Sequence, residues 1–148
     1  MSKGKIIGLG VVGLIVILIL MGIGQYNGLV GKDVAVDTAW AQVENVLQRR
    51  ADLIPNLVAS AKGYMKHERE VLDNLSKARA AYAGAGNRDA KVAAAGQMEG
   101  ALARLLVVME NYPNLKADAS VNRLMDELAG TENRISVERM RYNDTVAD

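Results

Sequence analysis

The hydrophobic and polar positions divide the chain into two parts. An unbroken apolar run from Ile6 to Ile23 carries no charged residue. As a helix this run would be about 27 Å long, close to the ~30 Å hydrocarbon core of a bilayer. From about residue 29 onward, apolar residues recur among polar ones with helical spacing. The pattern therefore predicts a transmembrane anchor, residues 1–24, and a polar helical domain, residues 25–148.

Apolar side chains are expected to face lipid all round the anchor. They include Ile6, Val11, Leu14, Ile17, Leu20 and Ile23. Gln25 and Tyr26 follow directly, where the membrane–water interface would lie. A cleaved signal peptide is the alternative, since Lys3 and Lys5 fit a basic n-region, but its apolar segment usually has only about 7–15 residues. The same two lysines favour a cytoplasmic N-terminus and a domain outside the cell membrane.

One apolar seam with alternating steps of four and three residues dominates the polar domain. It comprises Val36, Trp40, Val43, Leu47, Arg50, Ile54, Leu57, Ala61, Tyr64, Glu68, Val71, Leu75, Ala78 and Tyr82. A mean step of about 3.5 residues is typical of coiled-coil packing. Because its phase continues across Pro55 and Gly63, the seam predicts one helix over residues 29–83, kinked near Pro55. A break at Gly63 into two helices is the alternative.

Two shorter helices are predicted to follow. Gly84–Asn87 provides a helix stop and a new N-cap, and Tyr112–Asn114 ends the next helix, which gives helices over residues 87–111 and 118–148. The second helix has its seam at Val92, Ala95, Glu99, Leu102, Leu106 and Met109, widened by Met98, Leu105 and Val108. The third has its seam at Val121, Leu124, Leu128, Thr131, Ile135, Glu138 and Tyr142. Short connections make such helices antiparallel neighbours. The predicted fold is therefore all-α, an N-terminal transmembrane helix followed by long antiparallel helices that form a coiled-coil-like bundle.

The unequal helix lengths leave part of the first seam in need of a cover. The second helix is less than half as long as the first, so the stripe from Trp40 to Leu47 must be covered by the third helix or by another subunit. The residues expected at such an interface are Trp40, Val43, Leu47, Arg50, Ile54, Leu57, Glu138 and Tyr142.

Arg50 is a charged residue in an otherwise apolar seam, and Glu68, Glu99 and Glu138 interrupt the seams in the same way. An unpaired charge inside a helical bundle costs several kcal/mol. Arg50 is therefore expected to pair with a carboxylate on another helix or another subunit. Such a pair would either fix the helix register or act as a latch between subunits.

The residues offer little for catalysis or cofactor binding. His67 is the only histidine, and Val71 occupies the position one helical turn later where a zinc site would need a second ligand. Cysteine is absent, so neither a thiol nucleophile nor a disulfide can form. The domain after residue 24 has mixed charges and a net charge of −1, which disfavours nucleic acid as a partner. We therefore expect no catalytic residue, no metal site and no cofactor.

Four segments carry a resemblance to a known family. They are Tyr26–Val30, Trp40–Val58, Glu110–Ala117 and Gly130–Ile135 together with Arg141–Asn143. In order and position they closely resemble the LemA family of bacterial membrane proteins. The resemblance implies a membrane helix followed by an antiparallel helical bundle in the bacterial inner membrane, without a defined activity to carry over. Family members usually continue beyond the Arg-Tyr-Asn motif, whereas this sequence ends at Asp148.

Together these features predict a non-enzymatic scaffold. A single anchor in membrane lipid would hold long helices that associate side by side as a homo-oligomer. The alternative is an adaptor that binds an integral membrane protein, such as a membrane protease.

Overall fold

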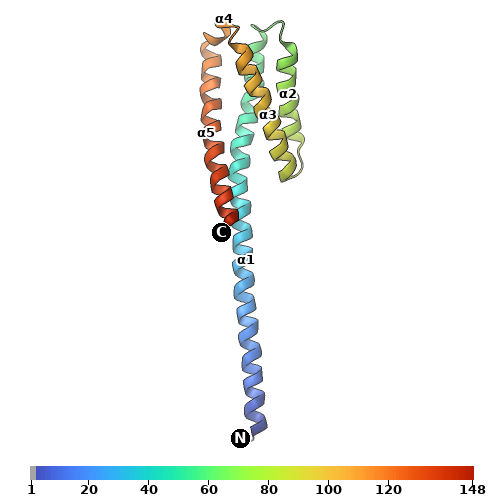
Figure 1. The fold of residues 1–148 in the computed structure, drawn as a ribbon, viewed down its shortest axis with the longest axis vertical. Helices are drawn as coiled ribbons and strands as arrows, with labels where there is room; N and C mark the ends of the chain where they lie inside the picture. Colours follow the sequence, from blue (N-terminus) through green and yellow to red (C-terminus); the bar gives the residue numbers. More distant parts are fainter. Residues whose placement is uncertain (1–2) are drawn as a thin grey trace.

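The computed structural model describes residues 3–148, except for the side chains of residues 3–7 and 9. It contains the helices α1 (Lys3–Lys62), α2 (Arg69–Gly84), α3 (Arg88–Met109), α4 (Pro113–Lys116) and α5 (Ala119–Ala147), with no strand over the described range. The first half of α1 projects alone, and its second half is surrounded by the other helices (Figure 1). α2 and α5 run back toward the N-terminus, while α3 runs away from it. The predicted all-α class is confirmed.

The helix α1 is both the projecting rod and the spine of the bundle. Its apolar first part is exposed, as at Leu20, which is 62% exposed. Further along the same helix Ile54 and Leu57 are at most 1% exposed. No loop separates the two parts. The bundle is therefore built directly on the helix that carries the apolar run. We call the end of the bundle nearest that run its base and the opposite end its tip.

The predicted single helix over residues 29–83 is wrong, and the alternative break at Gly63 is correct. α1 ends at Lys62, where the backbone N–H groups of Tyr64 and Met65 both donate to the Ala61 carbonyl, and α2 then runs back beside α1. Glycine inside a helix costs about 1 kcal/mol relative to alanine. Folding back also buries the apolar face of α2 against α1 and α3, which an extended rod would leave in solvent. The predicted seam positions Tyr64 and Glu68 fall in the turn between α1 and α2, and neither is buried.

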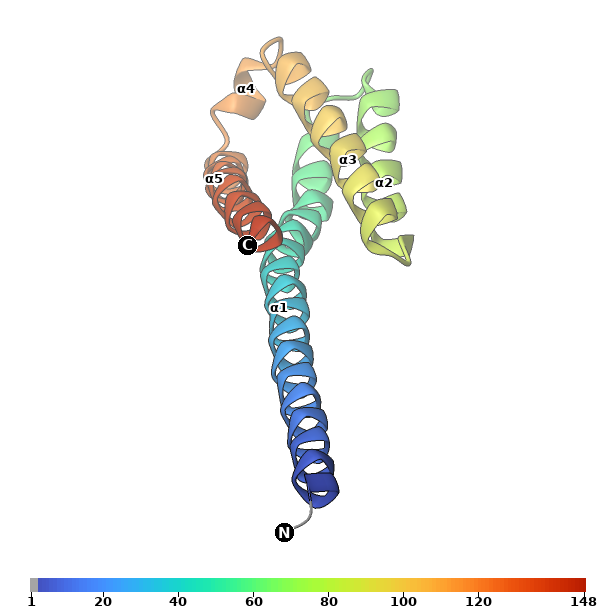
Figure 2. The same ribbon diagram turned by 60° about the horizontal axis from the view of Figure 1, so that its bottom comes forward.

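The helix α5 supplies the cover that the base of α1 needs. Val43 and Leu47 on α1 are each 2% exposed. α5 packs along α1 more extensively than any other helix does, and its C-terminal end reaches below the ends of α2 and α3 (Figures 1 and 2). Lys32 near the base donates from Nζ to the Asp148 backbone oxygen at 2.5 Å. The cover is therefore part of the same chain, and no second subunit is needed to bury this stripe.

The buried face of α3 contains most of the predicted seam but not Val92 or Glu99. Val92 and Glu99 were expected in the core but are exposed. The buried side chains are Ala94, Ala95, Met98, Leu102, Leu105 and Met109, and all but Ala94 belong to the predicted seam or its widened part. Turning this face toward α2 buries methionine and leucine and leaves the Glu99 carboxylate in water, where it needs no partner. The expected charged break in this seam therefore does not exist.

Pro55 lies inside α1 and interrupts its hydrogen-bond ladder. Proline has no N–H, so the carbonyl of Ala51, four residues earlier, loses its helical donor. Arg79 on α2 donates from Nε to this carbonyl oxygen at 3.4 Å. A side chain of the neighbouring helix thus replaces the missing backbone bond. We infer that this contact helps α1 to pass through Pro55 as one helix.

The replacement predicts an energetic coupling between Arg79 and Pro55. Arg79→Met should lower the free energy of unfolding by about 1 kcal/mol, because the Ala51 carbonyl loses its donor. In a Pro55→Ala background the same substitution should cost clearly less, since an alanine at this position supplies the missing backbone N–H. Denaturant unfolding of the full chain in mild detergent measures both costs, with the exposed Arg104→Met as the control. Equal costs in the two backgrounds would show that Arg79 does not serve this carbonyl.

Candidate functional site

A cluster of polar and aromatic side chains joins three helices at the base of the bundle. Arg88 donates from Nη2 to Asp37 Oδ1 at 2.9 Å and from Nη1 to the Tyr142 hydroxyl at 3.2 Å. Its guanidinium carbon lies 5.1 Å from the centre of the Trp40 ring and 5.6 Å from that of Tyr142. The two rings meet edge to face, with centres 5.6 Å apart. We call Asp37, Trp40, Arg88 and Tyr142 the basal cluster.

Local sequence places each member of the basal cluster. Asp37 and Trp40 lie one turn apart on α1, so both face the same side. Arg88 is the first residue of α3, directly after Asn87, whose side chain caps the helix by accepting from the Ala90 N–H at 2.8 Å. Tyr142 comes from the last turns of α5. Cation–π contacts and the ion pair therefore fix the α2–α3 hairpin against the α1–α5 pair.

A second ion pair reinforces the same junction. Lys91 on α3 pairs with Glu44 on α1, two turns along α1 from Asp37. Both side chains are partly buried, which reduces the solvent screening of their attraction. The hydrogen bond that Arg88 donates to Asp37 is the main cause that raises the pKa of Arg88. The junction thus uses charge pairing between α1 and α3 where direct apolar packing between these helices is sparse.

A cavity of about 260 Å³ opens beside the basal cluster. It is lined by Trp40, Val43, Leu47, Val92, Arg139, Tyr142 and Asn143. Aromatic and aliphatic walls with one arginine suit the binding of a small apolar group. The described residues contain no group of three or more His, Cys, Asp or Glu side chains that could hold a metal ion. The walls of this cavity therefore offer apolar surface and one cationic side chain.

Arg50 is buried to 2% exposure and paired within the chain. Its Nε donates to Thr131 Oγ1 at 3.3 Å, and its Nη2 pairs with Glu132, both on α5. Thr131 in turn donates to the Leu128 carbonyl at 2.7 Å. The predicted carboxylate partner on another helix is confirmed. Since Glu132 is half exposed, the pair is anchored in the core at one end and solvated at the other.

The residues expected at a subunit interface have internal roles. Val43, Leu47, Arg50, Ile54 and Leu57 are buried within the protomer, and Trp40 and Tyr142 belong to the basal cluster. Glu138 is partly buried and accepts a hydrogen bond from Arg141 in its own helix at 2.9 Å. The structure thus gives these side chains partners in the same chain, and their role at a subunit interface stays a prediction.

Sequence reasoning missed the charged half of the junction. Asp37, Arg88, Lys91 and Glu44 are exposed or partly buried surface residues whose pairing depends on how the hairpins dock. No local pattern links α1 to the start of α3. Only the N-cap at Asn87 marked the place where Arg88 would enter the bundle.

The apolar run stands free of the bundle. Its expected lipid-facing residues Val11, Leu14, Ile17, Leu20 and Ile23 are 51 to 62% exposed, and the side chain of Ile6 lies outside the described residues. Gln25 and Tyr26 are exposed as well. By length and composition the part of α1 from Gly10 could cross a membrane, and so could α3, although a third of the most apolar stretch of α3 is buried. An exposed N-terminal apolar helix fits a single-pass membrane protein.

The tip of the bundle is closed by a tyrosine–carboxylate pair. The Tyr64 hydroxyl donates to Asp118 Oδ2 at 2.9 Å. Asp118 is also the N-cap of α5 and accepts from the N–H groups of Ser120 and Val121. These bonds, first of all that from Tyr64, lower the pKa of Asp118, while the same bond raises the pKa of Tyr64. The turn after α1 is thereby tied to the start of α5.

This pair predicts a pH dependence of stability. The pKa of Asp118 is lower in the folded protein than in the unfolded chain. The ionised Asp118 carboxylate therefore stabilises the fold above its unfolded pKa, and this stabilisation is lost as the pH falls through the folded pKa. Thermal unfolding followed by circular dichroism should therefore show a falling melting temperature below about pH 4. Asp118→Asn keeps an N-cap side chain and should make this acid slope shallower. If the melting temperature of the variant falls with pH as steeply as that of the unaltered protein, Asp118 is not the cause of the acid sensitivity.

The Arg50 contacts predict opposite outcomes for two substitutions. Arg50→Met replaces the buried stem with an apolar chain and leaves Glu132 free to be solvated, so stability should change by less than about 1 kcal/mol or increase. Arg50→Glu places a buried carboxylate beside Glu132 and should cost more than about 3 kcal/mol. Denaturant unfolding measures both. A severe loss in Arg50→Met would mean that the charge itself holds α5 in place.

The comparisons with known proteins agree with this architecture. No curated protein matches the chain. The model of the LemA family matches residues 39–148, which include the bundle part of α1 and all of α2 to α5. This match covers well over half of the sequence. It includes the Arg50 contacts, the Tyr64–Asp118 pair and every member of the basal cluster but Asp37. The chain therefore belongs to the LemA family.

Proposed function

We propose that the protein is a membrane-anchored, non-enzymatic helical scaffold that self-assembles at the bacterial cell membrane. The observation that carries this proposal is the continuity of α1, which has an exposed apolar first part and a buried second part. A bundle built on its own anchor helix is held at a fixed height above the bilayer. Family membership supports the same reading. The two lysines before the apolar run favour a bundle on the outer side of the cell membrane.

The segment between the apolar run and the bundle offers a surface for self-assembly. Leu29, Val30 and Val34 are 67, 43 and 59% exposed. They lie on α1 around Lys32, where α5 ends, so α5 covers little of them. We call residues 25–36 the stalk. Side-by-side packing of two stalks above adjacent anchors would remove these side chains from water.

The interior of the bundle supports a structural role. Its core is formed by aliphatic and methionine side chains and Tyr82, with Arg50 and Thr131 as the buried polar residues among those described. Both are satisfied by contacts within the chain, and Thr131 also lines a small cavity with Arg49, Glu127 and Arg134. A core of this kind resists deformation and offers no acid–base pair. The proposal therefore assigns binding and positioning to the bundle.

The same stalk also fits a helix of another protein. An integral membrane partner, such as a membrane protease, could place one of its own helices against Leu29, Val30 and Val34. In that case the protein would act as an adaptor. The two functions differ in whether the occupant of the stalk is a second copy of this chain.

Measurement of size in mild detergent tests the scaffold directly. Light scattering of the purified full chain should give a discrete oligomer, and Leu29→Gln with Val34→Gln should shift it toward the monomer, because polar stalks gain less from packing together. Val107→Gln is the matched control, since Val107 is 71% exposed on α3 and distant from the stalk. A monodisperse monomer of the unaltered protein would contradict self-assembly. Cross-linking from position 34 in cells would then identify an adaptor by the other protein it captures.

A further inference from the structure

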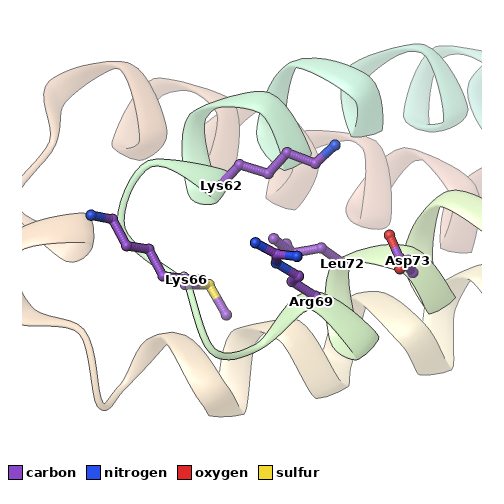
Figure 3. Close-up of a pocket in the computed structure, with 6 residues that line it drawn as sticks. Lys62, Lys66, Arg69, Leu72 and Asp73 are labelled. Carbon is purple, nitrogen blue, oxygen red and sulfur yellow. The ribbon is translucent and has the colours of Figure 1, made fainter.

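The tip of the bundle contains a cavity whose walls are mainly cationic. Its volume is about 410 Å³, and it is lined by Lys62, Met65, Lys66, Arg69, Leu72 and Asp73. It lies where α1 ends, the turn over residues 63–68 reverses the chain and α2 begins (Figure 3). This is the end of the bundle farthest from the apolar run. The cavity is thus far from the anchor and from the stalk.

Three cations and one carboxylate give this cavity a net charge of plus two. In Figure 3 the Arg69 guanidinium lies near the centre of the group, Lys62 extends from the end of α1 on the opposite side of the space, and Lys66 extends away from Arg69. None of the three cations forms an ion pair with a described carboxylate. By contrast Lys116, also at the tip, is paired with Glu110 at 2.7 Å. The positive charge of the cavity is therefore available to a ligand.

The backbone around the cavity also favours an anionic ligand. α2 begins at Arg69, and Glu68 at its N-cap position makes no side-chain capping bond. The Glu68 carboxylate instead accepts from the Tyr112 hydroxyl at 3.4 Å. The N-terminal turn of a helix carries free N–H donors and a partial positive charge. Below the cations the cavity has an apolar floor, since Met65 and Leu72 are each 1% exposed, and a low-dielectric floor strengthens charge interactions.

We propose that this cavity binds a phosphate group. A phosphate at neutral pH carries about −1.5 to −2 charges, which matches the surplus of the walls, and arginine binds two of its oxygens in parallel. Asp73 could compete with phosphate for the Arg69 guanidinium. The two residues are four apart on one helix, a spacing suited to an ion pair. That pair is not formed in the structure. Asp73 is therefore the one acidic side chain in the lining of the cavity, and it would repel a bound phosphate.

A titration of the full chain in mild detergent with inorganic phosphate tests this proposal. Nitrogen–proton correlation spectra should show saturable shifts at the amides of Arg69 and Glu70, beyond those caused by sodium chloride at equal ionic strength. Lys66→Gln combined with Arg69→Gln should weaken binding at least about tenfold, since two charged contacts are lost. Asp73→Asn should strengthen binding. Lys116→Gln, a matched lysine outside the cavity, should leave binding unchanged.

The source of the phosphate is distinguished by a second arm with tripolyphosphate. Tighter binding of tripolyphosphate than of inorganic phosphate would assign the site to a phosphate carried on a larger molecule, and equal binding would assign it to the free ion. The proposal fails if neither ligand gives saturable shifts, or if Lys116→Gln weakens binding as much as the double substitution. It also fails if Asp73→Asn weakens binding, because Asp73 would then be needed to hold Arg69 in place.

Discussion

The uninterrupted backbone of α1 is the constraint on which the rest of the structure depends. Each residue of a helix is held to its neighbours by hydrogen bonds within the same segment. The two ends of a continuous helix therefore keep a fixed distance and direction relative to each other. In this protein that segment begins with the apolar run and ends in the core of the bundle. The point of weakness is Pro55, and Arg79 from α2 donates to the carbonyl that proline leaves without a partner. The bundle therefore supports the helix on which it is built.

The contacts around α1 explain why the bundle keeps one arrangement. α5 is held along α1 by apolar packing and by the buried Arg50 contacts, and the α2–α3 hairpin is held at the base by Arg88 and Lys91. Polar contacts of this kind have directional geometry, which apolar packing alone lacks. Val43 and Leu47 are buried within the chain, so the exposed apolar side chains of α1 lie in the apolar run and on the stalk. The tip, which points away from the anchor, is free to meet a charged ligand.

Much of the fold could be predicted from the sequence, but the polar contacts between the helices could hardly be predicted. The seams of α1 and α5 matched the burial of residues such as Leu47, Ile54 and Ile135, because apolar spacing reflects a buried face directly. The break at Gly63 was not preferred, since the apolar phase passes through the turn unchanged. On α3 the spacing places Val92 and Glu99 in the seam although both are exposed, because the small residues around the buried face give a weak signal. Arg88 and Asp37 come together only through docking of the hairpins, which no local pattern contains.

The most direct test of the account is a distance along α1 in a lipid bilayer. The protein has no cysteine, so single labels can be attached at Gln25→Cys and Lys62→Cys, both exposed positions, and their separation measured by pulsed electron resonance in nanodiscs. A continuous helix predicts one narrow distribution centred near about 56 Å. A broad distribution, or one centred well below that value, would mean that anchor and bundle are joined by a flexible or broken segment and would contradict the account.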